Sequence, residues 1–188
     1  DFTSIIDRTG LDSIAAEWPL KKNPSSPYVK YNIDLKEGFD FIPMWIADMN
    51  FNTVPTIPEA MAKRIAHPLY GYFQPREEYF ELIKKWQKER NGVENLEAKN
   101  IGYENGVLGG VATALAVLCS KGDKILLHAP TYVGFTSVIS NNGYTPVHSW
   151  LKEDENGVLR MDYEDMDKKL KEEHIHVAIF CSPHNPSG

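Results

Sequence analysis

The chain closes with the apolar run Val177-Ala178-Ile179-Phe180-Cys181, followed by the loop Ser182-Pro183-His184-Asn185-Pro186-Ser187-Gly188. A continuous β-branched and aromatic run that ends at proline and glycine predicts a buried strand of a parallel sheet. Open α/β folds bind ligands at the carboxyl ends of such strands, so we expect Asn185 at the rim of a site. Pro186 biases Asn185 towards an extended backbone, which holds the amide in a stiff frame. A simple strand-ending turn is the alternative, because Asn-Pro is common turn chemistry.

Composition narrows the classes of protein that the chain can belong to. The 188 residues are 42% hydrophobic and carry a formal net charge of -6, which suits a sizeable core and argues against nucleic acid as a partner. There is no apolar stretch of about 18 residues and no signal-peptide pattern at the start, so we expect a soluble cytoplasmic protein without membrane contact. Cys119 and Cys181 lie far apart in apolar surroundings, which favours reduced, packed thiols.

The first part of the chain is predicted to form an extended arm. Residues 1–43 are irregular and include the proline- and serine-rich stretch Asn23–Pro27. We expect this arm to cross to a partner subunit. The dense apolar segment Phe41–Phe51 is predicted to thread through the core near the site, and an anchor for the arm is the alternative. The predicted domains are therefore an arm with its threading segment over 1–50 and half of an α/β domain over 51–188.

Two helices and an aromatic loop are predicted next. One helix runs from its N-cap Thr56 to His67, and a second covers about residues 76–90 with apolar side chains at helical spacing. Between them, Tyr70 and Tyr72 flank a glycine, and a loop in this position presents tyrosine hydroxyls. Aromatic core packing is the alternative, and it suits Tyr70 better than Tyr72.

A glycine-rich stretch forms a second site candidate. The sequence Asn105-Gly106-Val107-Leu108-Gly109-Gly110 leads into an apolar helix predicted over Val111–Cys119. Small residues at a helix start expose unpaired backbone N–H groups at the positive end of the helix dipole, where a phosphate binds. The spacing matches neither the dinucleotide fingerprint nor a Walker loop. Alternatively, Gly109 and Gly110 let this helix pack closely on the sheet.

Strands and helices alternate along the second half of the chain. An extended segment or short strand is predicted over Asn100–Glu104. It is followed by a strand over Lys124–His128, a helix over Val133–Asn141, a strand over Tyr144–Trp150 and a turn at Glu153–Gly157. A helix then runs from its cap Asp162 through Glu173, with a solvated face at Lys168–Lys171, and the last strand begins at His176. This order predicts an α/β fold with a largely parallel or mixed sheet covered by helices on both faces. No helix follows to cover the last strand, so we expect a truncated domain.

Three strand ends together suggest a phosphorylated aromatic cofactor. Tyr132 follows the strand that ends at His128, where its ring could stack on a flat heterocycle. The glycine-rich helix start supplies an anion site, and Asn185 supplies a short uncharged amide. His174 and His176 lie two apart without a third ligand, so no metal site is predicted.

The motifs also resemble a known family. In chain order they are Asn105-Gly106-Val107, Ala129-Pro130-Thr131-Tyr132 and Ser182-Pro183-His184-Asn185-Pro186-Ser187-Gly188. They resemble the fold-type I pyridoxal phosphate enzymes of the class I/II aminotransferase group. Two further stretches, Pro43-Met44-Trp45-Ile46-Ala47-Asp48-Met49-Asn50-Phe51 and Tyr70-Gly71-Tyr72, resemble the cystathionine β-lyase-like carbon–sulfur lyases within that group. Asn50 and Ser187 stand where the family usually has Asp and Thr, which puts only fine substrate preference in doubt.

The resemblance implies a set of residues around pyridoxal 5'-phosphate. Backbone groups of Gly106, Val107 and Leu108 would bind the cofactor phosphate. Tyr72 would reach the phosphate of the neighbouring subunit's cofactor, which implies a homodimer with a shared active site. Tyr132 would stack on the pyridine ring. The implied fold is a three-layer αβα transferase-like large domain with a mostly parallel mixed sheet.

The resemblance also implies where the substrate binds and that the Schiff-base lysine is absent from this chain. Asn185 would bond the ring oxygen of the cofactor and help seat the substrate carboxylate, over which the backbone near Ala47 would close. The lysine that forms the Schiff base in the family follows the Asn-Pro motif, so it would lie beyond Gly188 and no catalytic residue is predicted in this chain. Lys152 echoes the family's Ser-x-x-Lys spacing, and we interpret it as a surface coincidence.

The implied activity is carbon–sulfur β-cleavage, in which L-cystathionine or a cysteine S-conjugate gives a thiol, pyruvate and ammonia. A class I/II aminotransferase acting on an amino acid and a 2-oxo acid is the alternative. A third hypothesis is not enzymatic: the chain could belong to a nucleotide-binding or regulatory protein that uses the α/β fold without catalysis.

Overall fold

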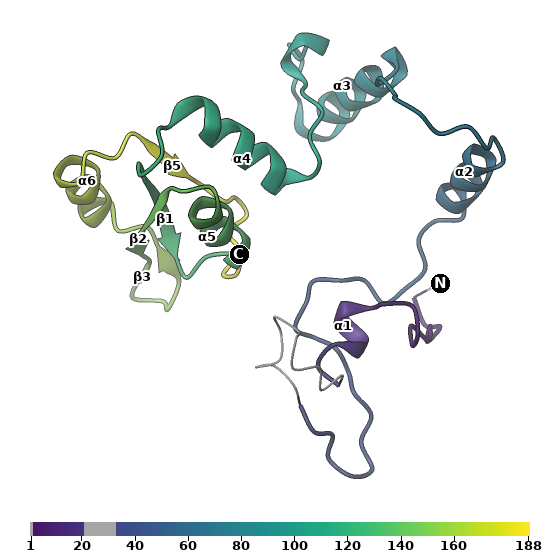
Figure 1. Ribbon diagram of the computed structural model, residues 1–188. Coiled ribbons are helices and arrows are strands. Elements are labelled where there is room, and N and C mark those ends of the chain that lie inside the picture. The colour runs from purple at the N-terminus through teal and green to yellow at the C-terminus, as the bar shows by residue number, and fades with distance from the viewer. Residues whose placement is uncertain (1, 21–32) are drawn as a thin grey trace. The chain divides into compact units, whose positions relative to one another are not determined.

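The computed structural model describes residues 2–20 and 33–188 (Figure 1). The chain divides into two compact units, Asp1–Tyr72 and Phe73–Gly188. The predicted domain boundary at residue 50 stays a prediction. The proline- and serine-rich stretch Asn23–Pro27 lies outside the described residues.

The first unit holds a short helix that the sequence pattern does not predict. Helix α1 spans Ile14–Glu17, and the Ser13 hydroxyl caps it by accepting from the Ala16 N–H at 3.2 Å. The Trp45 indole N–H donates to the Ala15 carbonyl at 3.0 Å, so the apolar segment is fastened to this helix. These contacts support the alternative reading of that segment as an anchor for the arm. Its threading through a core stays a prediction.

Helix α2, Thr56–Ile65, corrects two predictions. Thr56 is not the N-cap, because Pro55 takes that position and no side chain caps the helix. Tyr70 does not pack in a core, since its ring is 67% exposed in the structure. Its hydroxyl instead donates to the Ile65 carbonyl at 3.0 Å, which folds the loop back on the end of α2.

Helix α3, Glu77–Asn91, opens the second unit within one residue of its predicted bounds. Gly92 ends it in the left-handed conformation with φ of 68°, and its N–H bonds the Lys88 carbonyl at 3.1 Å. The short 3-10 helix η2, Ala98–Asn100, comes next. Ile101 after it is extended, and residues 101–104 belong to no strand.

Three parallel strands form the main sheet, in the order β2-β1-β5. Strand β1 is Lys124–Ala129, β2 is Thr145–Trp150 and β5 is Val177–Ile179. Lys124 pairs with Thr145, and Leu127 pairs with Ile179. Strand β5 is shorter than the predicted apolar run and only partly buried. The strand that is buried almost throughout is the central one, β1.

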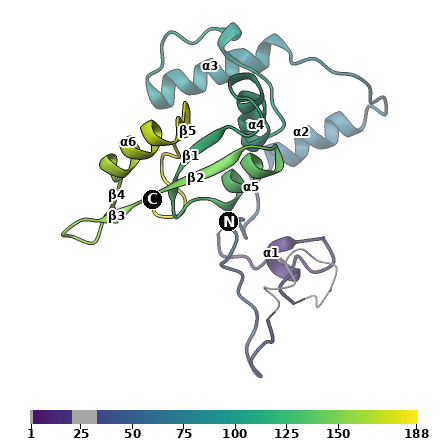
Figure 2. The ribbon, with the colours of Figure 1, turned by 60° about the vertical axis from the view of Figure 1, so that its left-hand side comes forward.

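Helices cover both faces of this sheet, as predicted for a three-layer αβα fold. Helices α4, Val107–Leu118, and α5, Val133–Asn141, pack on one face, while α6, Tyr163–Glu172, packs on the other (Figure 2). Alternation along β1 divides the core into two clusters. The first contains Leu115, Ile125, Leu127, Ile139 and Tyr144; the second contains Leu126, Met166 and Ile175.

A polar network fastens α6 to β2. The buried Ser149 hydroxyl donates to the Asp165 carboxylate at 2.6 Å, and the Lys169 ammonium contacts the same carboxylate at 2.7 Å. Lys169 also donates to the His148 carbonyl at 2.8 Å. Hydrogen bonds from Lys169 and then Ser149 lower the pKa of the Asp165 carboxyl. The prediction that Lys169 lies on a solvated face is therefore wrong.

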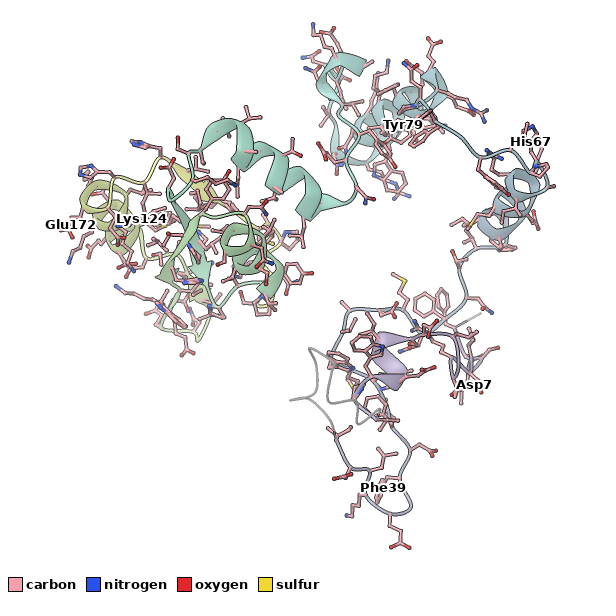
Figure 3. All side chains as sticks on the ribbon, in the orientation of Figure 1. Asp7, Phe39, His67, Tyr79, Lys124 and Glu172 are labelled. Atoms are coloured by element: carbon pink, nitrogen blue, oxygen red, sulfur yellow. The ribbon has the colours of Figure 1, made fainter. Side chains whose placement is uncertain are left out.

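The ends of α6 follow the prediction more closely. The Asp162 carboxylate accepts from the Asp165 N–H at 3.2 Å and so caps the helix. The antiparallel strands β3, Lys152–Glu153, and β4, Leu159–Arg160, flank the predicted turn that precedes it. Figure 3 shows Lys124 beside the end of α6 that carries Glu172, and Lys124 forms an ion pair with the neighbouring Glu173 at 3.2 Å. In the described part of the chain, no helix is long and apolar enough to cross a bilayer.

Candidate active site

The glycine-rich stretch forms the start of α4, four residues earlier than predicted. Gly106 is the N-cap with a left-handed φ of 85°, and the first helical hydrogen bond runs from the Gly110 N–H to its carbonyl at 3.1 Å. No side chain caps this end. The N–H groups of Val107 and Leu108 thus belong to the first turn, where they have no intrahelical partner and can bind an anion.

The alternative role of the other two glycines is not supported. A Cβ at Gly109 or Gly110 would meet only the Glu104 side chain, at 3.9 Å and 3.7 Å, which is ordinary contact. Close packing of the helix on the sheet therefore does not require glycine at these positions. A phosphate at this helix end would share the space with the exposed Glu104 carboxylate, which would have to turn away because like charges repel.

Tyr132 lies beside the same helix end. It is the N-cap residue of α5, its side chain is 41% exposed, and its ring meets Phe135 edge-on with centroids 5.5 Å apart. A Cβ at the buried Gly134 would lie 2.3 Å from the Tyr132 ring and 2.9 Å from Leu108 Cδ1. The space above Gly134 is thus filled by Tyr132 and Leu108 together. Sequence reasoning missed Gly134; the only signal was a small residue two positions after the site tyrosine.

The loop with Asn185 leaves the same edge of the sheet. Strands β1 and β5 are parallel neighbours, so the loops that follow them start side by side. His184 Nε2 lies 2.8 Å from the Pro130 carbonyl oxygen, two residues before Tyr132. Asn185 itself is exposed. The structure thus brings together the backbone segments that carry Leu108, Tyr132 and Asn185.

Beneath these loops lies a histidine that sequence reasoning did not single out. His128 is 4% exposed, and neither ring nitrogen has a hydrogen-bond partner among the described residues. Its ring meets those of Phe180 and His184 edge-on, with centroids 5.3 Å and 6.2 Å away. Burial lowers the pKa of His128, and the nearby His184 lowers it further. His128 is therefore neutral at pH 7.

Because His128 is buried in its neutral form, we expect the protein to lose stability as the pH falls. The pKa of His128 is below its ordinary value of 6.5 in the fold, so the unfolded chain takes up the proton first as the pH falls. The contribution of neutral His128 to the free energy of unfolding is fully present above about pH 6.5, and it is lost as the pH falls towards the pKa of His128 in the folded protein. We expect His128→Phe to flatten this slope in urea unfolding measured from about pH 8 to about pH 5. The exposed His176→Phe should keep it; equal slopes in both variants would contradict the assignment.

Two predicted site residues lie in the other unit. Tyr72 and Ala47 are both exposed there. The segment around Ala47 is held by an ion pair between Arg8 and Asp48 at 2.7 Å. The role of Tyr72 at a neighbouring subunit's cofactor and that of Ala47 at the substrate carboxylate stay predictions.

Several side chains considered in the sequence analysis lie outside the site. Lys152 forms a 2.5 Å ion pair with Asp162 and is 66% exposed, which agrees with a surface role; this hydrogen bond raises its pKa. Cys119 and Cys181 are free thiols, as predicted. His174 and His176 both lie before β5 and are exposed, and His174 has a φ of 54°.

A hollow of about 430 Å³ lies at the start of α3, where Tyr79 is labelled in Figure 3. Its lining includes Phe73, Arg76, Tyr79 and Tyr103. The rings of Phe73 and Tyr103 meet edge-on with centroids 5.5 Å apart. None of the residues predicted to bind cofactor or substrate lines it, so it is not the site described above.

Fold and site together define a three-layer α/β protein whose strand-end loops bring an open helix start, an aromatic ring and an amide to one sheet edge. Residues 41–188 match the family model described as aminotransferase class I and II. Because this match covers most of the chain, the protein belongs to that family. The resemblance of its motifs to the family is confirmed.

Its relatives include named lyases. The chain is 32% identical to cystathionine beta-lyase PatB of Bacillus subtilis (strain 168) over 149 residues, which cover 79% of this chain and 38% of that protein. Cystalysin from Treponema denticola, solved with pyridoxal 5'-phosphate, matches with a TM-score of 0.83 and 29% identity over all of this chain and 44% of its own. The pyridoxal phosphate-bound C-S lyase from Staphylococcus hominis matches with a TM-score of 0.81 and 28% identity at the same coverages. The chain thus spans less than half of each.

Proposed function

We propose that the protein is a pyridoxal phosphate-dependent carbon–sulfur β-lyase. Its substrates would be L-cystathionine or cysteine S-conjugates, and its products a thiol, pyruvate and ammonia. The observation that carries the proposal is the family match over residues 41–188, which contains all the predicted site residues. The names of relatives such as PatB and the C-S lyase from Staphylococcus hominis favour lyase activity within that family.

The residues at the sheet edge fit this cofactor. The uncapped start of α4 offers the N–H groups of Val107 and Leu108 to a phosphate, and the half-exposed ring of Tyr132 offers a face to a flat heterocycle. Asn185 offers an uncharged amide that can bond a ring oxygen. When bound, pyridoxal phosphate supplies an electron sink that stabilises negative charge at the α-carbon of an amino acid.

The chain's own residues would orient the reactants. Tyr132 would fix the plane of the cofactor ring by stacking, and Asn185 would set its rotation within that plane while contacting the substrate carboxylate. The backbone near Ala47 would close over the carboxylate and exclude water. Tyr72 would complete the phosphate site of a neighbouring subunit, so the active form would be a homodimer.

Transamination is the second candidate, because the family includes aminotransferases by its own description. Both reactions require negative charge at the α-carbon of the substrate. They differ in the next step, because a lyase expels a thiolate from the β-carbon, whereas an aminotransferase passes the amino group to a 2-oxo acid. A need for a 2-oxo acid acceptor therefore separates the two.

The test uses the full-length protein loaded with pyridoxal phosphate. We expect L-cystathionine to give pyruvate and a free thiol in equal amounts without any added 2-oxo acid. A sample treated with borohydride in the presence of cofactor, which reduces a lysine imine, serves as the inactive control. Product that forms only with a 2-oxo acid would establish the aminotransferase instead. A protein that acquires no reducible chromophore would contradict both activities.

A further inference from the structure

A single side chain joins the two loops at the sheet edge. The ladder between β1 and β5 has its last pair at Leu127 and Ile179. Beyond the strands, among the described residues, the hydrogen bond between His184 and Pro130 is the one that connects loop 130–132 with loop 181–188. It links residues 54 positions apart in the sequence. The separation of the loops therefore depends on His184.

The bond to Pro130 requires a proton on Nε2 of His184. A carbonyl oxygen can only accept, so His184 Nε2 must carry a proton to donate to Pro130. That N–H is present in one neutral tautomer and in the imidazolium. The neighbouring His128 is buried and unpartnered, and it is neutral above its lowered pKa, so it places no like charge beside the ring.

The loop around Asn185 is closed onto the same histidine. The Gly188 N–H bonds the His184 carbonyl at 2.6 Å, which encloses Asn185 in a turn of five residues. Residue 185 directly follows the histidine in the chain, and Tyr132 lies two residues after its acceptor, Pro130. A change in the His184 contact therefore moves the amide relative to the phenol ring.

We propose that His184 is a positioning residue, which holds Asn185 at a fixed distance from Tyr132 through its hydrogen bond to Pro130. This rests on the proposed function, in which both side chains contact one flat cofactor. A rigid ring is bound well only when its edge and its face are contacted together, so loops that are held in place beforehand lower the ordering cost of binding. His184 itself contacts neither cofactor nor substrate in this role.

The test compares two substitutions in the full-length protein. His184→Leu removes the donor, whereas His184→Gln keeps an N–H near the position of Nε2. We expect the leucine variant to bind pyridoxal phosphate about tenfold more weakly, as for the loss of one hydrogen bond, and the glutamine variant to recover most of that loss. The matched control is His176→Leu at the exposed residue just before β5, which should bind like the wild type. Affinity is read from the absorbance of apoprotein titrated with cofactor.

A second measurement needs no cofactor. Hydrogen–deuterium exchange of the apoprotein should rise in peptides covering 129–135 and 181–188 in the leucine variant and stay near wild type in the glutamine variant. Unchanged exchange and affinity in His184→Leu would overturn the proposal. So would equal losses in both variants, or a fall in melting temperature that accounts for the weaker binding. Failure of lyase activity with intact cofactor binding would overturn the proposed function alone.

Discussion

Leu127→Ala is expected to lower the free energy of unfolding by about 2–5 kcal/mol, the usual range for removing a buried leucine side chain from a core. Leu127 is 1% exposed and belongs to the central strand β1. It packs in the cluster that contains Leu115 of α4 and Ile139 of α5, so truncation leaves a cavity between three elements. Urea unfolding of the full-length protein, followed by circular dichroism, measures the change.

The same substitution at an exposed site is the control. Leu118 is 67% exposed at the end of α4, so Leu118→Ala removes a side chain that the described residues do not bury. We expect its effect to stay within about 0.5 kcal/mol. Equal destabilisation by the two variants would show that β1 is not the centre of the core.

Gly134→Ala is expected to weaken pyridoxal phosphate binding about two- to tenfold while changing stability little. The new Cβ would lie 2.3 Å from the Tyr132 ring, which is closer than any real contact, so the ring must swing away. That ring is partly exposed and packs edge-on against Phe135, and Leu108 Cδ1, at 2.9 Å from the new Cβ, must shift as well. Alanine favours a helix over glycine by about 0.5–1 kcal/mol, which offsets the cost of these shifts to stability. The lost stacking corresponds to about 0.5–1.5 kcal/mol of cofactor binding.

Cofactor titration and thermal melting of the same samples measure the two effects separately. Gly102→Ala is the matched control, because a Cβ there meets no atom within 4 Å. It should change neither quantity. Wild-type affinity in Gly134→Ala would show that the position of the Tyr132 ring does not matter for the cofactor. A large loss of stability would show instead that the ring cannot move.

The regular elements of the second unit could be predicted because local signals agreed there. Helix α5 begins and ends where it was predicted, and α6 has its predicted Asp162 cap. The start of α4 was misplaced because glycine pairs suggest a break, whereas Gly106 alone makes the turn and the next glycines are helical. Helix α1 was missed because four residues are too few to show a helical period.

The candidate site could be predicted only where it depends on strand ends. The rule that ligands bind at the carboxyl ends of parallel strands led to Tyr132 and Asn185 without any coordinates. The contacts of Gly134 and His184 could not be predicted, because each depends on a neighbour from another element. Lys169 was assigned to solvent by composition, and only the structure shows it at the His148 carbonyl.

Because hydrogen bonds join α6 to β2 directly, the packing of the helix on the sheet depends little on the length of the connection between them. Ser149 and Lys169 join the helix to the strand directly, and the hairpin of β3 and β4 adds the Lys152–Asp162 ion pair at the start of the helix. Lengthening a surface connection costs little when its two ends are already held, since each doubling of a loop adds only about 0.6 kcal/mol. Insertions at residues 154–158 should therefore be tolerated, and related proteins can differ in length there without disturbing the sheet edge.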